Sequence, residues 1–264
     1  MDDPIYKPEI KTSLFSPFLV AVQFLTVMPP LLKRPFTDQE LGQAVGYYPL
    51  VGLLLGGVLV AANSALALLF PTALRIALLL ALWVILTGVL HLDGFLDACD
   101  GLFGGWTPEK RLHIMRDERV GAFALAGGVL LLLTKYVALT TVAATAVSAT
   151  AAPLIKALLI APVLARWAMS LALIRYPYAR TEGLGRTMKD MASGRELLLA
   201  TGTAVLVALL VGGSVGVWAL LAAVVTAVAT AHFVMQRIPG LTGDIYGTIC
   251  ELTELVILLV FAAW

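Results

Sequence analysis

The chain has little charge. Only 13% of its 264 residues are Asp, Glu, Lys or Arg, whereas soluble domains carry about 25%. Its 18 basic and 17 acidic residues nearly cancel to a net charge of +1, so no basic surface of the kind that binds nucleic acid is expected. Apolar residues make up 60% of the chain, and the mean hydropathy is +0.93. This composition excludes an ordinary soluble domain and indicates a protein of the lipid bilayer.

Cysteine is also scarce, with only Cys99 and Cys250. Neither belongs to a C-x-x-C pattern, which excludes the usual zinc and dithiol redox motifs. Packing between helices and metal ligation both fit these positions, although hard carboxylate oxygens already crowd each one. Strand-like alternation, coiled-coil heptads and low-complexity tails are lacking as well. The start Met1-Asp2-Asp3 is acidic where a signal peptide needs basic residues, so we expect no cleavable signal.

Long apolar stretches, near or above about 18 residues, recur along the chain. They predict an all-α, polytopic integral membrane protein of about seven to eight helical segments, forming one membrane-embedded catalytic domain over residues 1–264. The first segment is short and carries Gln23 and Thr26, so we expect it to be re-entrant or interfacial. The segments are expected at about 14–28, 44–70, 72–92, 121–145, 152–174, 196–212, 215–235 and 245–263.

The basic residues are unequally shared between the connecting segments. If all eight segments span, most lysines and arginines fall on one side, in the connections 29–43, 91–119, 175–195 and 236–244. The positive-inside rule predicts that this side is cytoplasmic. The acids described next lie on the same side. We therefore expect a multi-pass protein of the cytoplasmic (inner) membrane with an active site that faces the cytoplasm.

A first group of acids follows the apolar run 76–90. Asp93, Asp97 and Asp100 have i, i+4, i+7 spacing and project from one face of a helix. Bare carboxylates this close repel one another, unless some are protonated or a cation lies between them. Carboxylate oxygens suit Mg²⁺, which typically joins a few protein acids to substrate phosphates. The spacing predicts a Mg²⁺ site, beside which His91 could bind a metal, move a proton or anchor the interface.

A second group of acids opens the last apolar segment. Asp244 precedes Glu251 by seven residues, and Glu254 follows Glu251 by three, so all three can share a helix face. Asp244 could simply be a helix N-cap, as could Thr242, whereas Glu251 lies too far inside the helix to cap it. All six acids are candidate metal ligands, and they exceed what one Mg²⁺ needs. Two metal ions, or one metal with a general base such as Asp97 or Glu251, would use them.

Five basic residues are candidates for substrate binding. Three lie in loops, where they suit phosphate recognition but also simple membrane topology: Arg116, Arg119 and Arg180. Lys135 and Arg166 instead lie within apolar segments, where a buried charge faces a partner or a polar cavity. Pairing with the acids and contact with substrate are both open for these two. Gly94 and Gly101, between the acids, would leave room for a bulky group to approach the backbone.

Together these motifs resemble the cobalamin synthase family, the adenosylcobinamide-GDP ribazoletransferases. The resemblance covers essentially the whole chain, and the motifs recur in order. The longest are HLDGFLDACDGLFGG at 91–105, RLHIMRDERVGAF at 111–123 and GLTGDIYGTICELTE at 240–254. Shorter ones are FLTVMP at 24–29, YYPLVG at 47–52 and YARTEGLG at 178–185.

The resemblance implies a Mg²⁺-dependent membrane transferase of cobalamin biosynthesis. The family joins adenosylcobinamide-GDP to α-ribazole or its 5′-phosphate and releases GMP, which is the lower-ligand attachment step. Asp93, Asp97 and Asp100 would then hold Mg²⁺ on the pyrophosphate, and arginines would hold the charge of the departing GMP. The expected partners are these small molecules and the bilayer, with no nucleic acid. A homo-oligomer, or assembly with other late cobalamin-pathway enzymes, also remains open.

Two alternative functions stay open. CDP-alcohol phosphotransferases share membrane helices and a DGxxAR motif, but here Asp93-Gly94-Phe95-Leu96 is followed by Asp97-Ala98, so the Ala-Arg step is missing. A cation- or proton-coupled transporter would also use intramembrane acids. It predicts acids near the bilayer midplane, whereas these cluster at segment ends on one side. That placement favours an enzyme.

Overall fold

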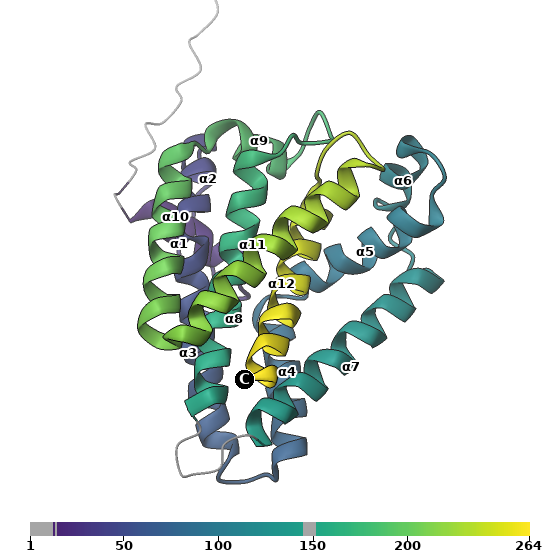
Figure 1. The fold of residues 1–264 in the computed structure, drawn as a ribbon. Coiled ribbons are helices and arrows are strands. Elements are labelled where there is room, and N and C mark those ends of the chain that lie inside the picture. The colour runs from purple at the N-terminus through teal and green to yellow at the C-terminus, as the bar shows by residue number, and fades with distance from the viewer. Residues whose placement is uncertain (1–12, 14, 145–151) are drawn as a thin grey trace, which may run out of the picture.

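The computed structural model describes residues 13, 15–144 and 152–264, so the acidic start of the chain lies outside it. The described residues form helices and no strand beyond one isolated bridge, which confirms the all-α prediction. The helices, shown in Figure 1, are α1 (Ser16–Leu25), α2 (Asp38–Ala44), η1 (Val45–Tyr47), α3 (Tyr48–Leu66), α4 (Thr72–Leu86), α5 (Leu90–Gly104), α6 (Pro108–Ile114), α7 (Ala122–Ala144), α8 (Ala152–Arg175), α9 (Leu184–Met191), α10 (Gly194–Val207), η2 (Ala208–Gly212), α11 (Ser214–Met235) and α12 (Gly243–Ala263).

Six helical stretches are long and apolar enough to cross a membrane, which confirms a multi-pass protein. They are Asp38–Leu66, Ala122–Ala144, Ala152–Arg175, Gly194–Gly212, Ser214–Met235 and Gly243–Ala263. The predicted boundaries agree with these to within a few residues, apart from the start of the first span, which begins at Asp38 rather than near Ala44. Helix α1 is short, as the sequence predicted, with only 10 residues.

One predicted span is broken. The apolar segment expected at 72–92 ends at Leu86, and α5 leaves α4 at an angle of 87°. Gly88 and Val89 form the bend, with φ of 61° and 63°. Glycine adopts this left-handed conformation freely, but a β-branched valine is strained in it. The bend directs α5, which carries the first group of acids, across the bundle instead of along it (Figure 1).

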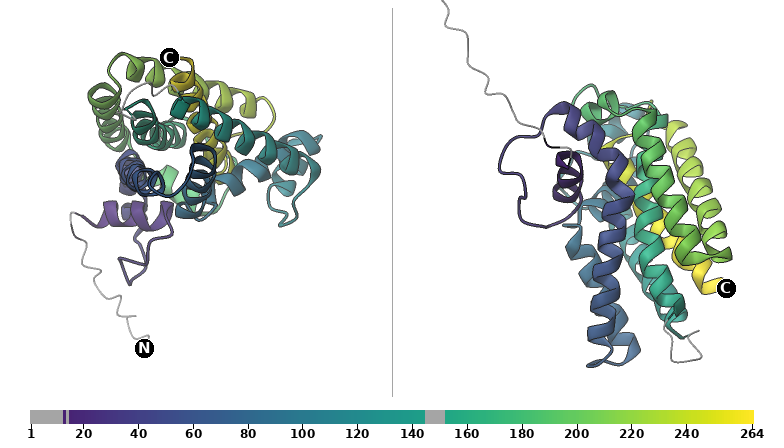
Figure 2. Two further views of the ribbon diagram at one scale, coloured as in Figure 1. Left: turned by 90° about the horizontal axis from the view of Figure 1, so that it is seen from below. Right: turned by 90° about the vertical axis from the view of Figure 1, so that its left-hand side faces the viewer.

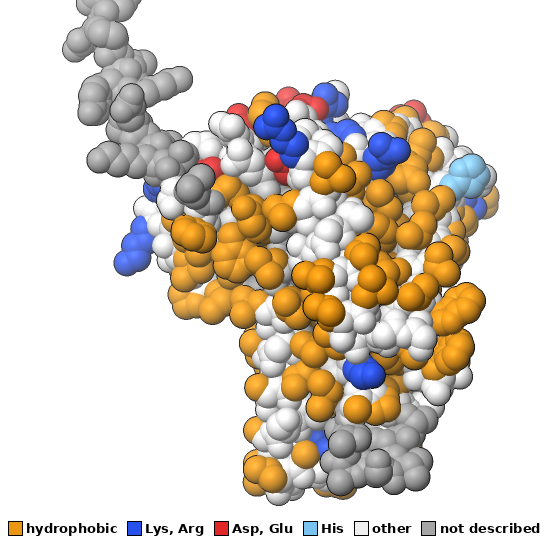
Figure 3. Space-filling view, turned by 60° about the vertical axis from the view of Figure 1, so that its left-hand side comes forward, with side chains coloured by type: hydrophobic (Ala, Val, Ile, Leu, Met, Phe, Trp, Pro, Cys, Tyr) orange, Lys and Arg blue, Asp and Glu red, His pale blue; other side chains and the backbone are white. Residues whose placement is uncertain are grey.

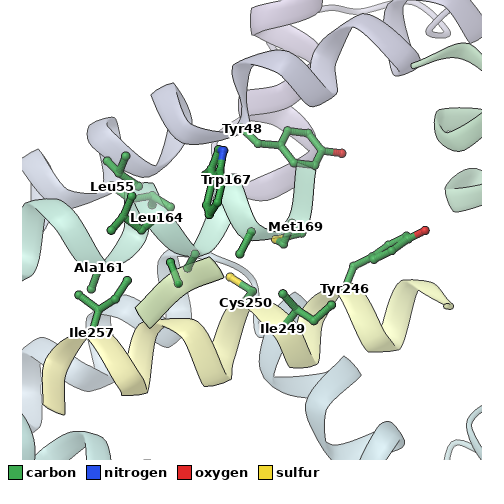
Figure 4. Packing of buried hydrophobic residues seen from close by; sticks show 14 of the residues in the cluster. Tyr48, Leu55, Ala161, Leu164, Trp167, Met169, Tyr246, Ile249, Cys250 and Ile257 are labelled. Atoms are coloured by element: carbon green, nitrogen blue, oxygen red, sulfur yellow. The ribbon is translucent and has the colours of Figure 1, made fainter. Parts of the chain in front are cut away.

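Helix α8 forms the centre of the bundle. Its most apolar window is 83% buried, and it packs against α3 on one side and α12 on the other. Gly52 of α3 lies so close to α8 that an added Cβ would be 2.4 Å from the Pro162 carbonyl oxygen. Such close approach at small residues is how membrane helices gain packing contacts. Figure 4 shows Ala161 and Leu164 of α8 lying between α3 and Ile257 of α12.

The outer helices leave most of their surface free. The spans Gly194–Gly212 and Ser214–Met235 are only 22% and 28% buried, and Figure 2 shows them side by side along one flank. On the face shown in Figure 3, apolar side chains cover the flank, and most charged side chains lie at one end, near α9. A broad apolar flank with charge at the end is the surface that a bilayer requires.

Candidate active site

The site begins where α5 crosses the start of α12. A Cβ added to Gly94 would lie 2.9 Å from the Asp244 Cα atom, and one added to Gly247 would lie 2.9 Å from the His91 carbonyl oxygen. The two helices are therefore in backbone contact, which needs glycine on both sides. This contact brings the acids of α5 next to Asp244, although about 150 residues separate them in the sequence.

The expectation that glycines leave room here for a bulky ligand is wrong. The backbone of Asp244 fills the space at Gly94. At Gly101, an added Cβ would lie 2.4 Å from Met115 Cγ and 2.9 Å from the Arg111 carbonyl oxygen. Both glycines serve packing between helices on the side where a Cβ would lie, and Gly94 also lines one of the cavities described below.

A short bridge ties the loop after α8 to the loop before α12. The Ala179 N–H donates to the Leu241 carbonyl oxygen at 2.8 Å, and the Leu241 N–H donates to that of Pro177, also at 2.8 Å. The bridge fixes Arg180, whose guanidinium donates to Asp244 Oδ2 at 2.8 Å. Both side chains remain partly exposed. A predicted substrate-binding arginine and a predicted metal ligand thus form an ion pair at the site.

Thr242 caps α12, as one of the two predicted alternatives had it. Its Oγ1 accepts a hydrogen bond from the Ile245 N–H at 3.4 Å. The same hydroxyl lies 3.1 Å from Asp244 Oδ2 and donates to it. With Thr242 in the capping position, the Asp244 carboxylate is left to face Arg180.

The three aspartates of α5 differ in what they contact. Asp100 accepts hydrogen bonds from the Gly121 N–H at 2.6 Å and the Ala124 N–H at 2.9 Å, so it caps the start of α7. Within the described part of the chain, no hydrogen bond or ion pair reaches the carboxylates of Asp93 or Asp97. Asp97 is half-buried, and most of the charges that act on it are other aspartates. Uncompensated negative charge of this kind favours a bound cation.

Three adjoining cavities surround these acids, with volumes of about 380, 330 and 260 Å³. Arg116 lines all three, Arg180 lines the first two, and Asp93 lines the first and the third. The shared residues join the cavities into one cleft with carboxylates and guanidinium groups facing each other. Larger hollows of about 530 and 550 Å³ lie elsewhere and are lined by neither acid group.

Arg119 lies at the rim of this cleft. Its guanidinium pairs with Asp117 at 2.6 Å, and 88% of its side chain is exposed. Hydrogen bonding to Arg119 holds the pKa of the Asp117 carboxyl well below its usual range. Arg116 and Arg119 are both exposed to solvent, whereas Arg180 is partly buried, and each of the three lines at least one of the cavities.

Asp244 joins the first group of acids, but Glu251 and Glu254 do not. Lys135 of α7 pairs with Glu251 at 2.5 Å and with Glu254 at 2.6 Å, and all three side chains are buried. Arg166 of α8 also pairs with Glu254, and the Trp83 indole N–H donates to Glu254 Oε1 at 3.2 Å. The two negative and two positive formal charges of these four side chains cancel. Of the two interpretations of Lys135 and Arg166, the structure shows pairing with acids.

The six acids therefore do not converge on one centre. Among the residues that the structure describes, no three His, Cys, Asp or Glu side chains come close enough to hold a metal ion unaided. His91 lies between the two groups: it lines the 380 Å³ cavity, and its Nδ1 is 3.5 Å from the Arg166 guanidinium. Cys99 and Cys250 are free and buried, as packing residues are.

Sequence reasoning missed the aromatic and sulfur-bearing lining of the 380 Å³ cavity. Tyr178 and Tyr246 stack with ring centroids 6.2 Å apart, and Met169 and Met188 also line this space. Burial raises the pKa of Tyr178, so its hydroxyl remains a neutral donor. Both tyrosines stand inside motifs that were singled out for their charges, and their presence there was the available signal.

The fold and site define a polytopic membrane protein with an acid- and arginine-lined cleft suited to a phosphate-bearing substrate. The family model described as cobalamin-5-phosphate synthase matches residues 17–262, and the chain belongs to this family, as its motifs predicted. Relatives named adenosylcobinamide-GDP ribazoletransferase include one from Pseudomonas fluorescens, 40% identical over 247 residues that cover 92% of this chain and 97% of the relative.

Other relatives carry the same name. One from Desulfitobacterium hafniense is 38% identical over 243 residues, which cover 91% of this chain and 94% of the relative. One from Roseiflexus sp. is 33% identical over 247 residues, which cover 92% of this chain and 88% of the relative. No solved structure matches the chain.

Proposed function

We propose that this chain catalyses the reaction for which its relatives are named. It would join adenosylcobinamide-GDP to α-ribazole or its 5′-phosphate, with release of GMP. The observation that carries the proposal is the pair of uncompensated carboxylates, Asp93 and Asp97, in an arginine-lined cleft of a chain that matches the family over residues 17–262. Family membership favours neither a CDP-alcohol phosphotransferase nor a transporter.

The reaction is a displacement at phosphorus. A ribose hydroxyl of α-ribazole attacks the phosphorus attached to the cobinamide arm, and the bond from that phosphorus to the bridging oxygen breaks. GMP departs with the bridging oxygen. We assign the hydroxyl proton to Asp97, because this carboxylate carries no hydrogen bond and is half-buried. Glu251, the other predicted base, is a weaker candidate because it is bound to Lys135.

We propose Mg²⁺ as the cofactor, which Asp93 and one carboxylate oxygen of Asp97 would hold, leaving the other Asp97 oxygen for the hydroxyl proton. The residues fit such an ion, because two unpaired carboxylates lie one helical turn apart, whereas Asp100 and Asp244 have protein partners. No complete cage of protein ligands is built, which suits Mg²⁺ because it keeps several waters and takes substrate phosphates as ligands. When bound, it would neutralise charge on the pyrophosphate. Their ion pairs leave Glu251 and Glu254 outside this site.

The arginines have a separate part in the proposal. Arg116 lines all three cavities of the cleft, so it can reach the pyrophosphate whichever cavity holds it. Arg180 lies beside Asp244 and could exchange that partner for a phosphate oxygen, which its planar fork binds well. We propose that both stabilise the departing phosphate, with Arg119 at the rim steering the substrate inward.

We propose that the cleft opens to the cytoplasm and that the membrane is the inner membrane. The support is the gathering of loop arginines around the cleft, together with the positive-inside rule. The substrates, which carry phosphate groups, also favour a cytoplasmic opening, since charged phosphates do not cross a bilayer unaided.

GMP release by the purified, detergent-solubilised protein tests the function. The assay supplies adenosylcobinamide-GDP and α-ribazole 5′-phosphate, with Mg²⁺ or with EDTA, to the wild type, Asp97→Asn and Asp190→Asn. Asp190 is the matched control, since it forms an exposed ion pair with Arg186 on α9. We expect Mg²⁺-dependent release that Asp97→Asn abolishes and Asp190→Asn preserves. Folded wild-type protein that releases no GMP would overturn the function, and equal release in EDTA would overturn the cofactor.

A further inference from the structure

The 380 Å³ cavity is lined by two unlike sets of side chains. The charged set, called the charged end below, includes Asp93, Arg116, Arg180 and Asp244. The neutral set, called the neutral end below, consists of large side chains from separate helices: Phe24, Tyr48, Met169, Met188 and Tyr246. Figure 4 shows Tyr48 of α3 and Tyr246 of α12 reaching past Met169 of α8 in the same direction, away from the packed core. A ligand that matches this cavity has a charged or hydroxyl-bearing part and a flat apolar part.

Three buried polar atoms of the lining lack a partner among the described residues: Arg180 Nε at the charged end, and two atoms that no ion pair explains. The Tyr246 hydroxyl and His91 Nε2 make no hydrogen bond to any described residue, although the side chains of both residues are at least nine-tenths buried. The Tyr48 hydroxyl differs, because it donates to Met188 Sδ at 3.3 Å. Unpaired buried polar groups are rare in folded proteins and mark places where a ligand or water completes the bonding.

Both atoms are hydrogen-bond donors. Arg166 can only donate, so the His91 Nδ1 that faces it at 3.5 Å is the accepting nitrogen, and Nε2 carries the hydrogen. The Tyr246 hydroxyl is free to donate as well. The neutral end of the cavity therefore offers donors beside apolar surface, and the group that fits it is an aromatic ring with an acceptor at its edge and no donor of its own.

We propose that this end binds the benzimidazole ring of α-ribazole. The inference rests on the proposed function and adds the place of one substrate. The ring is flat and largely apolar, and its one unsubstituted nitrogen is an acceptor for the Tyr246 hydroxyl. Met169 and Met188 supply adaptable, polarisable surface for the ring's methyl groups. The ribose then lies toward Asp93, where the attacking hydroxyl is needed.

Size and chemistry disfavour the other substrate at this end. The corrin ring with its side chains is several times larger than a nucleoside, and a cavity of about 380 Å³ does not enclose it. The guanine of adenosylcobinamide-GDP is flat, but its ring N–H and amino group need acceptors. The free acceptors of this cavity are carboxylates such as Asp93 and Glu182, whereas at the neutral end Met188 Sδ already accepts from Tyr48, so guanine fits the neutral end less well than a ring without donors. The cavities beyond Arg116, of about 330 and 260 Å³, do not enclose a corrin either. We therefore place the pyrophosphate of adenosylcobinamide-GDP beside Arg116 and its corrin ring outside the cavities.

Steady-state kinetics with Tyr246→Phe test the proposal. We expect KM for α-ribazole to rise roughly tenfold, as the loss of one buried hydrogen bond implies, while KM for adenosylcobinamide-GDP and kcat stay within about twofold. Tyr136→Phe is the matched control, because Tyr136 lies on α7 and lines none of the cavities described above. It should change neither KM.

A second variant covers the apolar contact. Met169→Phe narrows the cavity, so we expect the preference for 5,6-dimethylbenzimidazole riboside over unsubstituted benzimidazole riboside to fall several-fold. Unchanged kinetics in both variants, from folded protein, would overturn the subsite. A rise in KM for adenosylcobinamide-GDP alone would place guanine there instead and also overturn it. If the wild type releases no GMP, the proposed function itself has failed, which is a distinct result.

Discussion

The two groups of acids make an instructive comparison. Both have carboxylates seven residues apart at helical spacing, Asp93 with Asp100 and Asp244 with Glu251, and both adjoin an apolar run. In the structure, the aspartates of α5 line an open cleft, and two of them have no partner. Glu251 and Glu254 of α12 are buried and paired with Lys135 and Arg166. Similar spacing thus produces an open, acid-lined cleft in one place and a neutral internal contact in the other.

The difference lies in the helices opposite. Lys135 of α7 and Arg166 of α8 place two positive charges against Glu251 and Glu254, and no lysine or arginine from another helix meets the Asp93 and Asp97 carboxylates among the described residues. A buried charge needs a partner within the protein, whereas a charge in an open cleft is solvated and can bind an ion or a ligand from solution. The comparison predicts that substitutions of Asp93 and Asp97 reduce activity, and that substitutions of Glu251 and Glu254 reduce stability.

The largest effect should come from Asp93→Asn. It removes half of the proposed cation site while keeping the side-chain shape, so GMP release should fall about 10⁴-fold, equivalent to about 5.4 kcal/mol. The melting temperature in detergent should stay the same or rise. Asp93 has no positive partner to lose among the described residues, and neutralising it reduces the repulsion between its carboxylate and the neighbouring aspartates. GMP release and thermal unfolding are the two measurements. An active Asp93→Asn enzyme, or one that melts many degrees lower, would contradict the assignment of Asp93 to activity and not to stability.

Glu254→Gln should show the opposite behaviour. It leaves Lys135 and Arg166 with only Glu251 between them, so one buried positive charge is uncompensated and the fold should lose about 3–5 kcal/mol. Thermal unfolding in detergent and the yield of monodisperse protein measure this loss. Protein that does fold should retain Mg²⁺-dependent GMP release. An unchanged melting temperature would mean that the ion pairs of Glu251 and Glu254 with Lys135 and Arg166 are solvated and do not stabilise the fold.

A double variant tests whether Lys135 and Glu251 stabilise the fold as a pair. Lys135→Met alone leaves Glu251 without its base, whereas Lys135→Met with Glu251→Gln removes a whole pair and keeps the pairing of Arg166 with Glu254. We expect the double variant to be about 2 kcal/mol more stable than the sum of the single effects predicts. Strict additivity in a double-mutant cycle would show that the two residues do not interact.

Sequence patterns predicted much of this molecule. The apolar runs indicated the membrane helices, and the spacing of Asp93, Asp97 and Asp100 indicated a common helix face. The bend at Gly88 and Val89 was missed, because nothing in an apolar run marks a left-handed valine. The separation of the acid groups was missed for another reason. Pairing depends on which helices are neighbours, and that is decided by packing at glycines and by loops, not by spacing along the chain.

Gly94→Ala tests the contact that builds the open group. The added Cβ would lie 2.9 Å from the Asp244 Cα atom, so α5 and α12 must move apart, at a cost of about 1.5 kcal/mol. Because the acids would shift as well, kcat should fall roughly tenfold or more. Gly57→Ala is the matched control, since nothing lies within 4 Å of the added atom there. Equal behaviour of the two variants would show that the helix contact is not needed for the site.

The smallest effect should come from Asp100→Asn. Asp100 sits one helical turn beyond Asp97 but accepts hydrogen bonds from the Gly121 and Ala124 N–H groups. Asparagine caps helices about as well as aspartate, so we expect less than about 1 kcal/mol lost in thermal unfolding and GMP release within a few-fold of wild type. Asp100→Ala, which removes the acceptor, should cost about 1 kcal/mol. A drop in GMP release for Asp100→Asn as deep as that for Asp97→Asn would mean that all three aspartates act on the substrate, and the boundary between structural and reactive acids would then lie beyond α5, between Asp244 and Glu251.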